Sequence, residues 1–230
     1  MRLVLFDIDG TLLDSAGMGR ASMQRALAEV FGSPGNPSYR YDGKTDKQIV
    51  RDVMRLEGHS DEHIDSRMEK LIERYLDGLR EGAASGKFHV RPLDGVVELL
   101  DALEARDDVL LGLLTGNVEP GAKLKLRAAG IDPDRFRVNA FGSDHENRPE
   151  LPAIAQRRAS ETLGLEIVGE RLVVIGDTPA DIECGQSLGA RAIGVASGHY
   201  TVEQLEALHP YAALPSLSNT QQALETILNA

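Results

Sequence analysis

Short apolar runs recur along the chain and alternate with longer amphipathic patterns. The runs cover 3–8, 110–114, 138–141, 172–175 and 190–195. Their hydrophobicity is continuous rather than alternating, which indicates strands covered on both faces, as in a parallel sheet. Helical patterns lie between them, near 95–106, 120–129, 152–163, 180–188 and 201–208. This order predicts an α/β fold with a doubly wound parallel sheet and right-handed crossovers.

The stretch from residue 14 to about residue 87 breaks this alternation, because it contains helical patterns and no convincing strand. One helical pattern covers 17–30. A second begins at Thr45, whose spacing to Gln48 resembles a capping box. A third follows Ser60, which is placed to cap a helix with an acidic first turn.

These helices fall between the first strand and the next core element. We therefore predict an inserted all-helical cap domain at 15–87 and a core made of 1–14 and 88–230. The connections at 15–17 and 86–92 are the expected hinges, because both are rich in small or turn-forming residues.

The first candidate for chemistry is the acidic pair Asp7 and Asp9, directly after the first apolar run. Residues i and i+2 of an extended chain point to the same side, so both carboxylates can face one site while Ile8 turns to the core. Gly10 permits the tight turn by which the chain leaves the sheet. Two carboxylates at the end of a buried strand repel each other, so the pair is costly unless it has a function. This favours a functional site over a solvated acidic turn.

A second candidate is the turn Thr115, Gly116 and Asn117, where another apolar run meets a helix. A hydroxyl, an amide and free backbone N–H groups at such a junction can bind an anion. The same turn can equally be only a helix cap.

The third candidate is Asp177, at the end of a further apolar run, with Asp181 four residues on in the following helix. Asp181 could also simply compensate the helix dipole. Ligands of open α/β sheets bind beyond the carboxyl ends of the strands, so we expect these acids to meet Asp7 in space. Oxygen ligands from Asp7 and Asp177 suit Mg²⁺, which is the predicted cofactor.

Charge and composition narrow the class of partner. The formal net charge is −11, with acidic and basic residues interspersed. A nucleic acid or an anionic membrane needs a basic face, so neither is an expected partner. The single cysteine, Cys184, excludes an internal disulfide and favours a reducing compartment. No apolar stretch resembles a signal or membrane-spanning segment, so a cytoplasmic protein is predicted; the oligomeric state is left open.

In their order and spacing, the three acidic or hydroxyl motifs resemble those of the haloacid dehalogenase-like (HAD) superfamily. They are similar to its phosphatases with a helical cap after the first strand, such as phosphoglycolate phosphatases, and the resemblance covers nearly the whole chain. It implies a Rossmann-like core and a Mg²⁺-dependent phosphatase acting on a small phosphorylated metabolite.

The resemblance also implies roles for individual residues. Asp7 would attack phosphorus and form an aspartyl-phosphate. Asp9 would protonate the leaving alkoxide, then deprotonate the hydrolytic water, and its backbone carbonyl would bind Mg²⁺. Thr115 would hold the phosphoryl group, while Asp177 would bind the metal with support from Asp181. A position beside other anions would raise the pKa of Asp9 and let it carry a proton.

One motif departs from the family pattern. The family offers a lysine shortly before the strand that ends in Asp177, but the stretch 143–149 contains none. Arg148 is the predicted substitute as a phosphate-binding cation, with Arg157 and Arg158 as alternatives. His145 in the same stretch is interpreted as a surface loop residue.

Substrate specificity is assigned to the cap. Lys44, in a turn that enters a helix, could bind a carboxylate or hydroxyl of the substrate, or could be a solvated loop lysine. Met18, Gly19 and Arg20 near the first hinge are weaker candidates. The apolar stripe of Leu27, Val30 and Phe31 is instead expected in the core of the cap.

Other functions of this architecture stay open. A sugar phosphomutase needs the same two aspartates and differs in returning the phosphoryl group to substrate. A dehalogenase would keep Asp7 without needing Asp9 or Asp177. A phosphonoacetaldehyde hydrolase has a small residue in place of Asp9. The intact acids also count against a non-catalytic binding protein on this scaffold.

Overall fold

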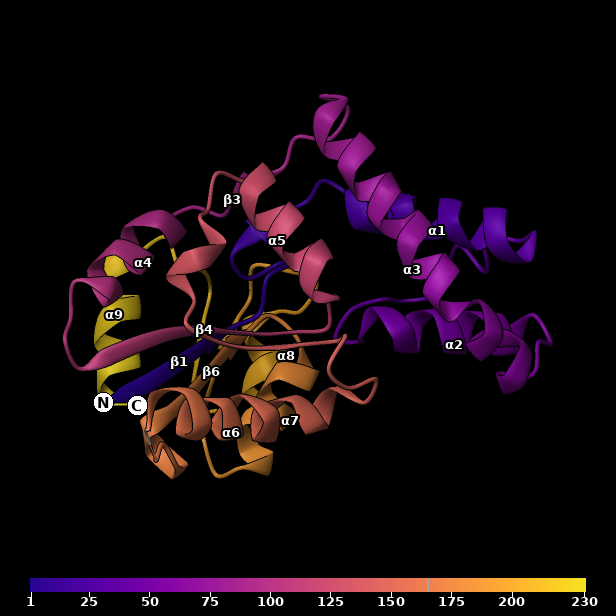
Figure 1. Cartoon of the computed structure of the whole chain (residues 1–230). Helices are drawn as coiled ribbons and strands as arrows, with labels where there is room; N and C mark the ends of the chain where they lie inside the picture. Colours follow the sequence, from indigo (N-terminus) through magenta and orange to yellow (C-terminus); the bar gives the residue numbers. More distant parts are fainter. Residues whose placement is uncertain (165) are drawn as a thin grey trace.

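The computed structural model describes residues 1–164 and 166–230. In these residues six parallel strands form one central sheet in the order β5-β4-β1-β6-β7-β8 (Figure 1). The strands are β1 (Arg2–Phe6), β4 (Val109–Thr115), β5 (Val138–Phe141), β6 (Leu172–Gly176), β7 (Arg191–Val195) and β8 (Ala212–Leu214). The chain runs outward from β1 to β5 on one side and from β6 to β8 on the other. The predicted doubly wound sheet is therefore confirmed.

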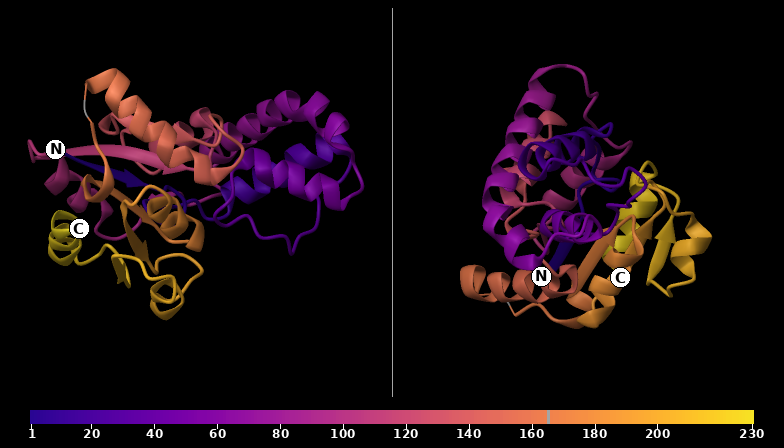
Figure 2. Two further views of the ribbon diagram at one scale, coloured as in Figure 1. Left: turned by 90° about the horizontal axis from the view of Figure 1, so that it is seen from below. Right: turned by 90° about the vertical axis from the view of Figure 1, so that its right-hand side faces the viewer.

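Helices cover both faces of the sheet, as the two views in Figure 2 show. The helices of the core are α4 (Val96–Glu104), α5 (Glu119–Ala128), α6 (Leu151–Leu163), α7 (Pro179–Ser187), α8 (Val202–Glu206) and α9 (Thr220–Asn229). Val4 and Phe6 of β1 pack in one hydrophobic cluster with residues of α4, α5 and α9. Leu3 and Leu5 face the opposite cluster, which contains residues of α6 and α7. Continuous hydrophobicity in β1 thus reflects burial on both faces.

The segment between β1 and α4 forms a separate group of helices at one end of the molecule (Figure 1). They are α1 (Met18–Phe31), α2 (Asp46–Leu56) and α3 (Asp61–Ala84). Their hydrophobic side chains form a cluster of their own, in which Leu27 is buried and Val30 and Phe31 are partly buried. Thr45 and Ser60 cap α2 and α3 through their side-chain oxygens, as the sequence predicts.

The two connections between these helices and the core run side by side. Residues of β2 (Leu13–Asp14) pair antiparallel with β3 (Arg91–Pro92). Ala16, Gly17 and Gly86 have positive φ angles, so the chain turns sharply at both expected hinges. Part of the second expected hinge is therefore a strand, and the residues with positive φ lie nearer the helices.

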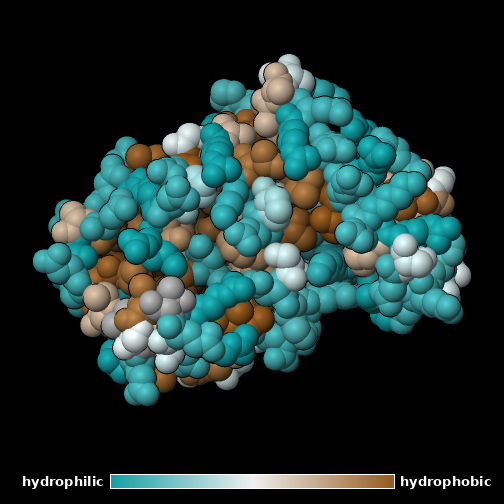
Figure 3. All heavy atoms as spheres, in the orientation of Figure 1, coloured by the Kyte–Doolittle hydropathy of each residue, from teal (hydrophilic) through white to brown (hydrophobic). Residues whose placement is uncertain are grey.

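Some elements have no counterpart among the predicted ones. β8, α9, the β2–β3 pair and the short 3₁₀ helices η1 (Pro133–Arg135), η2 (Arg148–Glu150) and η3 (Gly169–Arg171) are absent from the sequence-based assignment. Within the described residues, no helix combines the length and apolar character needed to cross a membrane. Hydrophilic side chains cover most of the face seen in Figure 3, with hydrophobic ones visible between them.

Candidate active site

Three strands of the sheet end at one place, and their last or next residues carry the predicted site. Asp7 follows β1, Thr115 ends β4, and Asp177 follows β6. β1 lies between β4 and β6, and the Asp7 backbone N–H donates to the carbonyl of Ile175 at 2.9 Å. This is the point at which the chain reverses its direction across the sheet, where open α/β folds bind their ligands.

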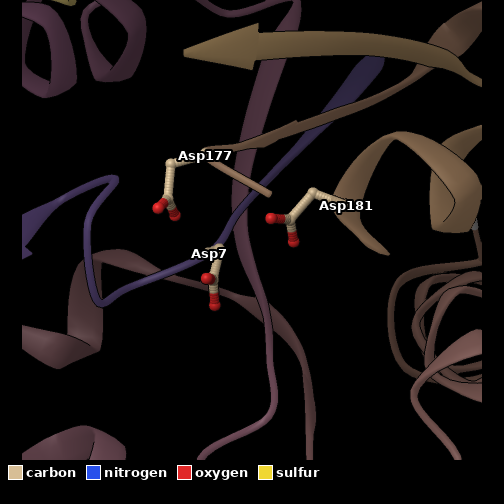
Figure 4. A group of neighbouring side chains, drawn as sticks. All are labelled: Asp7, Asp177 and Asp181. Atoms are coloured by element: carbon tan, nitrogen blue, oxygen red, sulfur yellow. The ribbon is translucent and has the colours of Figure 1, made fainter. Parts of the chain in front are cut away.

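The side chains of Asp7, Asp177 and Asp181 lie close together at the ends of the strands (Figure 4). One oxygen of each lies within 4.8 Å of the others, and all three side chains are buried. Burial raises the pKa of Asp7 to about 6, although Arg148 opposes the shift. Burial and the neighbouring Asp181 and Asp7 also raise the pKa of Asp177. Carboxylates that cost so much to ionise together favour a bound cation, and their hard oxygens fit Mg²⁺.

Asp181 is held by groups other than a metal. Its Oδ2 accepts hydrogen bonds from the backbone N–H of Thr178 at 3.0 Å and from the Thr178 hydroxyl at 2.6 Å, which forms a capping box for α7. Its Oδ1 accepts from Nη2 of Arg148. Asp181 therefore caps a helix and also anchors the arginine beside Asp7, while its expected role in supporting the metal stays a prediction.

Arg148 is the cation that the structure places beside Asp7. Its Nη2 lies 3.3 Å from Oδ1 of Asp7, and only 3% of the residue is exposed. Its buried Nε has no hydrogen-bond partner in the described residues. Burial disfavours the charged guanidinium, but Asp181 and Asp7 outweigh this and raise the pKa of Arg148 further. A charged arginine therefore lies beside the Asp7 carboxylate.

Asp9 lies at the edge of the same site with its side chain 37% exposed. Its Oδ2 accepts hydrogen bonds from Nζ of Lys125 at 2.6 Å and from Nδ2 of Asn117 at 2.9 Å. Burial alone would raise the pKa of Asp9, but Lys125 and Asn117 more than offset this and lower it. The expectation of a raised pKa is wrong, because it considered the neighbouring acids without this lysine.

Lys125 is a site residue that the sequence analysis did not identify. It lies on α5 with 4% exposure, and its charge is maintained by Asp9 and Asp46, which raise its pKa against the effect of burial. Its position carries a usable signal: Ala122, Lys125, Leu126 and Ala129 have the spacing of one helix face, and all four are buried. A lysine on the apolar face of a helix requires a buried acid as partner.

Backbone also approaches Asp177 closely. Gly10 has a φ of +81°, and a Cβ atom there would lie 2.5 Å from Oδ2 of Asp177. A Cβ at Gly198, in the loop after β7, would lie 1.9 Å from the same oxygen. The Thr11 hydroxyl donates to Oδ1 of Asp177 at 3.2 Å, and Ser197 donates to the carbonyl of Gly10 at 2.6 Å. The loop after β7 is thus a second part of the site that the sequence-based list lacks.

Comparison with known proteins agrees with this geometry. Residues 4–195 match the family model of the haloacid dehalogenase-like hydrolases. The chain belongs to this family.

Two relatives and one solved structure illustrate the similarity. The chain is 31% identical over 206 residues to the N-acetylmuramic acid 6-phosphate phosphatase of Pseudomonas aeruginosa, which covers 86% of this chain and 83% of the relative. It is 24% identical to the phosphoglycolate phosphatase of Aquifex aeolicus, with 83% of each chain covered. A hydrolase from Pseudomonas syringae has the same fold, with a TM-score of 0.74, 22% identity and 98% of each chain covered. The prediction of a HAD hydrolase that acts on phosphate monoesters is confirmed.

The cap of this HAD hydrolase is docked on the core loops beside the site. Asp46, the first residue of α2, accepts a hydrogen bond from the backbone N–H of Val118 at 2.8 Å and donates its own N–H to the carbonyl of Gly116 at 2.8 Å. The Thr45 hydroxyl donates to the carbonyl of Glu146 at 2.7 Å, and Arg51 forms an ion pair with the Glu146 carboxylate. These contacts join α2 to the loops after β4 and β5.

A cavity of about 870 Å³ lies between the cap and the core. The predicted site residues that line it are Asp7, Asp9, Lys44, Thr115, Gly116, Asn117, Arg148 and Asp177. The side-chain amide of Asn117, which lines the cavity, already has hydrogen-bond partners. Its Nδ2 donates to both Asp9 and Thr115, and its Oδ1 accepts from Lys125. Its backbone N–H also donates to the Thr115 hydroxyl, at 3.4 Å, so both kinds of donor on Asn117 already have partners.

The cap candidates differ in position. Nζ of Lys44 donates to Asp52 at 2.9 Å at the edge of the cavity, so its charge is already paired. Arg20 also lines the cavity and stacks on Tyr41, with 4.1 Å from its Cζ to the ring centre. Met18 is fully buried in the hydrophobic cluster of the cap, so its suggested role in specificity is wrong.

Arg157 and Arg158, the alternatives to Arg148, have other surroundings. Arg158 forms hydrogen bonds with Asp144 at 2.7 and 2.8 Å, and Arg157 is exposed on α6. His145 is exposed, and its ring contacts the backbone of Asn147, as a surface loop residue would.

Proposed function

We propose that this hydrolase cleaves small phosphate monoesters through an aspartyl-phosphate on Asp7. The observation that carries the proposal is the buried Asp7 carboxylate, which lies beside the Arg148 guanidinium and within 4.8 Å of the acidic pair Asp177 and Asp181. Arg148, together with a cation held by these acids, would reduce the repulsion between an anionic nucleophile and an anionic substrate.

Mg²⁺ would be held by the carboxylates of Asp7 and Asp177 and the backbone carbonyl of Asp9, with Asp181 as a support. When bound, the ion would cancel part of the negative charge of the phosphoryl group and of the nucleophile. Asp181 would act chiefly by holding Arg148, since both of its oxygens already accept hydrogen bonds.

The chain's own groups would carry the reaction. The Asp7 carboxylate would form a bond to phosphorus while the bond from phosphorus to the ester oxygen breaks. Thr115, the N–H group of Gly116, and Arg148 would hold the phosphoryl oxygens. Asp9 would give a proton to the leaving alkoxide; because Lys125 and Asn117 lower its pKa, its minor protonated form would do this. As a carboxylate it would then take a proton from the water that cleaves the phosphorus–oxygen bond of the acyl-phosphate.

The cavity bears on the class of substrate. Its volume of about 870 Å³ falls in the range of sites for small organic ligands and exceeds what a two-carbon phosphate fills. Both 2-phosphoglycolate and a larger ester such as a sugar phosphate are therefore candidates, and the two relatives named above act on one of each kind. Lys44 would contact the leaving group at the edge of the cavity.

A panel of phosphorylated metabolites tests the proposal. The purified protein with Mg²⁺ should release inorganic phosphate from at least one monoester, and chelator should stop the release. Asp7→Asn should reduce turnover to background, while Asp107→Asn, an exposed acid far from the site, should not. Release of phosphate by Asp7→Asn would refute the assignment of Asp7 as the nucleophile. Return of the phosphoryl group to a sugar would indicate a phosphomutase, and metal-free cleavage of a haloacid would indicate a dehalogenase.

A further inference from the structure

The two lysines of α5 differ in burial and in their partners. Lys123, two residues earlier, pairs with Glu119 on the surface of α5, with a side chain 36% exposed. Lys125 is instead buried and lies 2.6 Å from Oδ2 of Asp9 and 2.6 Å from Oδ1 of Asn117. Lys125 therefore connects α5, a helix of the core, to Asp9, which lies two positions after Asp7.

These contacts form a closed ring of hydrogen bonds. Nδ2 of Asn117 donates to Oδ2 of Asp9 at 2.9 Å and to the Thr115 hydroxyl at 2.9 Å. Lys125 donates to both Asp9 and Asn117, so the side chains of the three residues restrain one another. Lys125 and Asn117 both donate to Oδ2 of Asp9. Oδ1 is therefore the oxygen of Asp9 to which neither of these two residues donates.

The cap leaves room for this lysine. Gly19 lies on α1 above the ring, and a Cβ atom there would come within 3.1 Å of Nζ and 3.4 Å of Cε of Lys125. The hydroxyl of Tyr75 lies 3.9 Å from the same Cβ position. A residue with a side chain at position 19 would therefore press on the lysine from the cap side.

We propose that Lys125 is a positioning residue that acts through Asp9. It holds Oδ2 of Asp9 against Asn117, so that Oδ1 is the oxygen that gives a proton to the leaving group and takes one from water. This inference rests on the proposed phosphatase function, in which Asp9 transfers those protons.

The dependence of the rate on the leaving group tests this role. p-Nitrophenolate leaves readily without a proton, whereas the more basic phenolate depends on one. The quantity to compare is kcat/KM with Mg²⁺ for p-nitrophenyl phosphate and phenyl phosphate, since it reports the step that forms the phosphoenzyme. Lys125→Met should lower kcat/KM for phenyl phosphate about tenfold more than for p-nitrophenyl phosphate, because misplacing a catalytic group can cost ~100-fold.

Matched variants keep the test decisive. Asp9→Asn should show the same selective loss; equal loss on both esters in that variant would contradict the proposed function of Asp9 itself. Lys123→Met should behave as wild type. Gly19→Ala should raise thermal stability, since alanine favours the helix, yet show the selective loss in weaker form. The inference is wrong if Asp9→Asn shows the selective loss but Lys125→Met and Gly19→Ala lower kcat/KM for both esters equally or leave it unchanged. If Lys125→Met does not fold, the result for Gly19→Ala decides the test.

Discussion

Nη2 of Arg148 lies 3.3 Å from Oδ1 of Asp7, although the two residues are 141 positions apart in the sequence. The pair is buried, and Asp181 holds the same Nη2 atom from the other side. A pair of this kind fixes the Asp7 carboxylate, and in the proposed reaction it would present a guanidinium to the phosphoryl oxygens beside it.

Arg148→Ala should therefore reduce kcat with Mg²⁺ by about 100-fold or more, because removing one charge partner of a transition state typically has that effect. Arg148→Lys should recover part of the loss, since a lysine keeps the charge but not the planar guanidinium. Steady-state kinetics on the best ester of the panel measures both.

Arg157→Ala and Arg158→Ala are the matched controls for this prediction. Both residues lie on α6, and Arg158 is occupied by Asp144. Each variant should stay within about twofold of the wild-type kcat, as is usual for surface substitutions. A nearly wild-type Arg148→Ala together with an inactive Arg158→Ala would contradict the assignment of the loop after β5.

Gly116→Ala should keep the cap from docking. A Cβ atom at Gly116 would lie 2.1 Å from the carbonyl oxygen of Lys44 and 3.0 Å from Cα of Thr45, so backbone would have to move. We expect a larger radius of gyration by X-ray scattering and at least a tenfold loss of kcat/KM, because an open cap admits water to the site. Gly121→Ala meets side-chain atoms only, from 3.3 Å, and should leave both quantities nearly unchanged.

An unchanged radius of gyration in Gly116→Ala, with full activity, would show that the contact between Gly116 and the cap has no part in closure.

Asp46 should make stability depend on pH. Burial raises the pKa of this carboxyl to about 6, although Lys125 and the N–H of Val118 oppose the shift. The pKa of Asp46 is higher in the folded protein than in the unfolded chain, so protonation favours the folded state. This stabilisation is complete at a pH below the unfolded-state pKa and is lost as the pH rises through 6. A shift of about two units corresponds to ~3 kcal/mol.

The measurement is the free energy of unfolding by urea at several values between pH 4 and pH 8. Asp46→Asn keeps an oxygen that can accept the Val118 N–H but does not titrate, so it should gain stability over wild type as pH rises. Glu57→Gln, an exposed change at the end of α2, is the control and should follow wild type. A difference between wild type and Asp46→Asn that stays constant with pH would contradict the raised pKa.

The core fold was predictable because its strands are buried on both faces. Such strands must be apolar throughout, so 3–8 or 172–175 stand out from the helical patterns around them. The β2–β3 pair has two residues in each strand, and β8 has three. Segments this short contain too few positions to show a period, and only pairing with a neighbour makes them strands.

The acids of the site were also predictable, because a carboxylate at the end of a buried strand is costly unless it is used. The sequence by itself determined that Asp7, Thr115 and Asp177 end strands of one sheet, since that follows from local pattern and from the rules of parallel sheets. The sequence indicated Arg148 as the cation of the site but left Arg157 and Arg158 as alternatives, and the contact of Arg148 with Asp7 selects among them. It did not indicate Lys125, which reaches Asp9 across 116 positions of sequence. Those pairings, and the lowered pKa of Asp9 that follows from one of them, depend on how helices and loops pack in space, which no local pattern encodes.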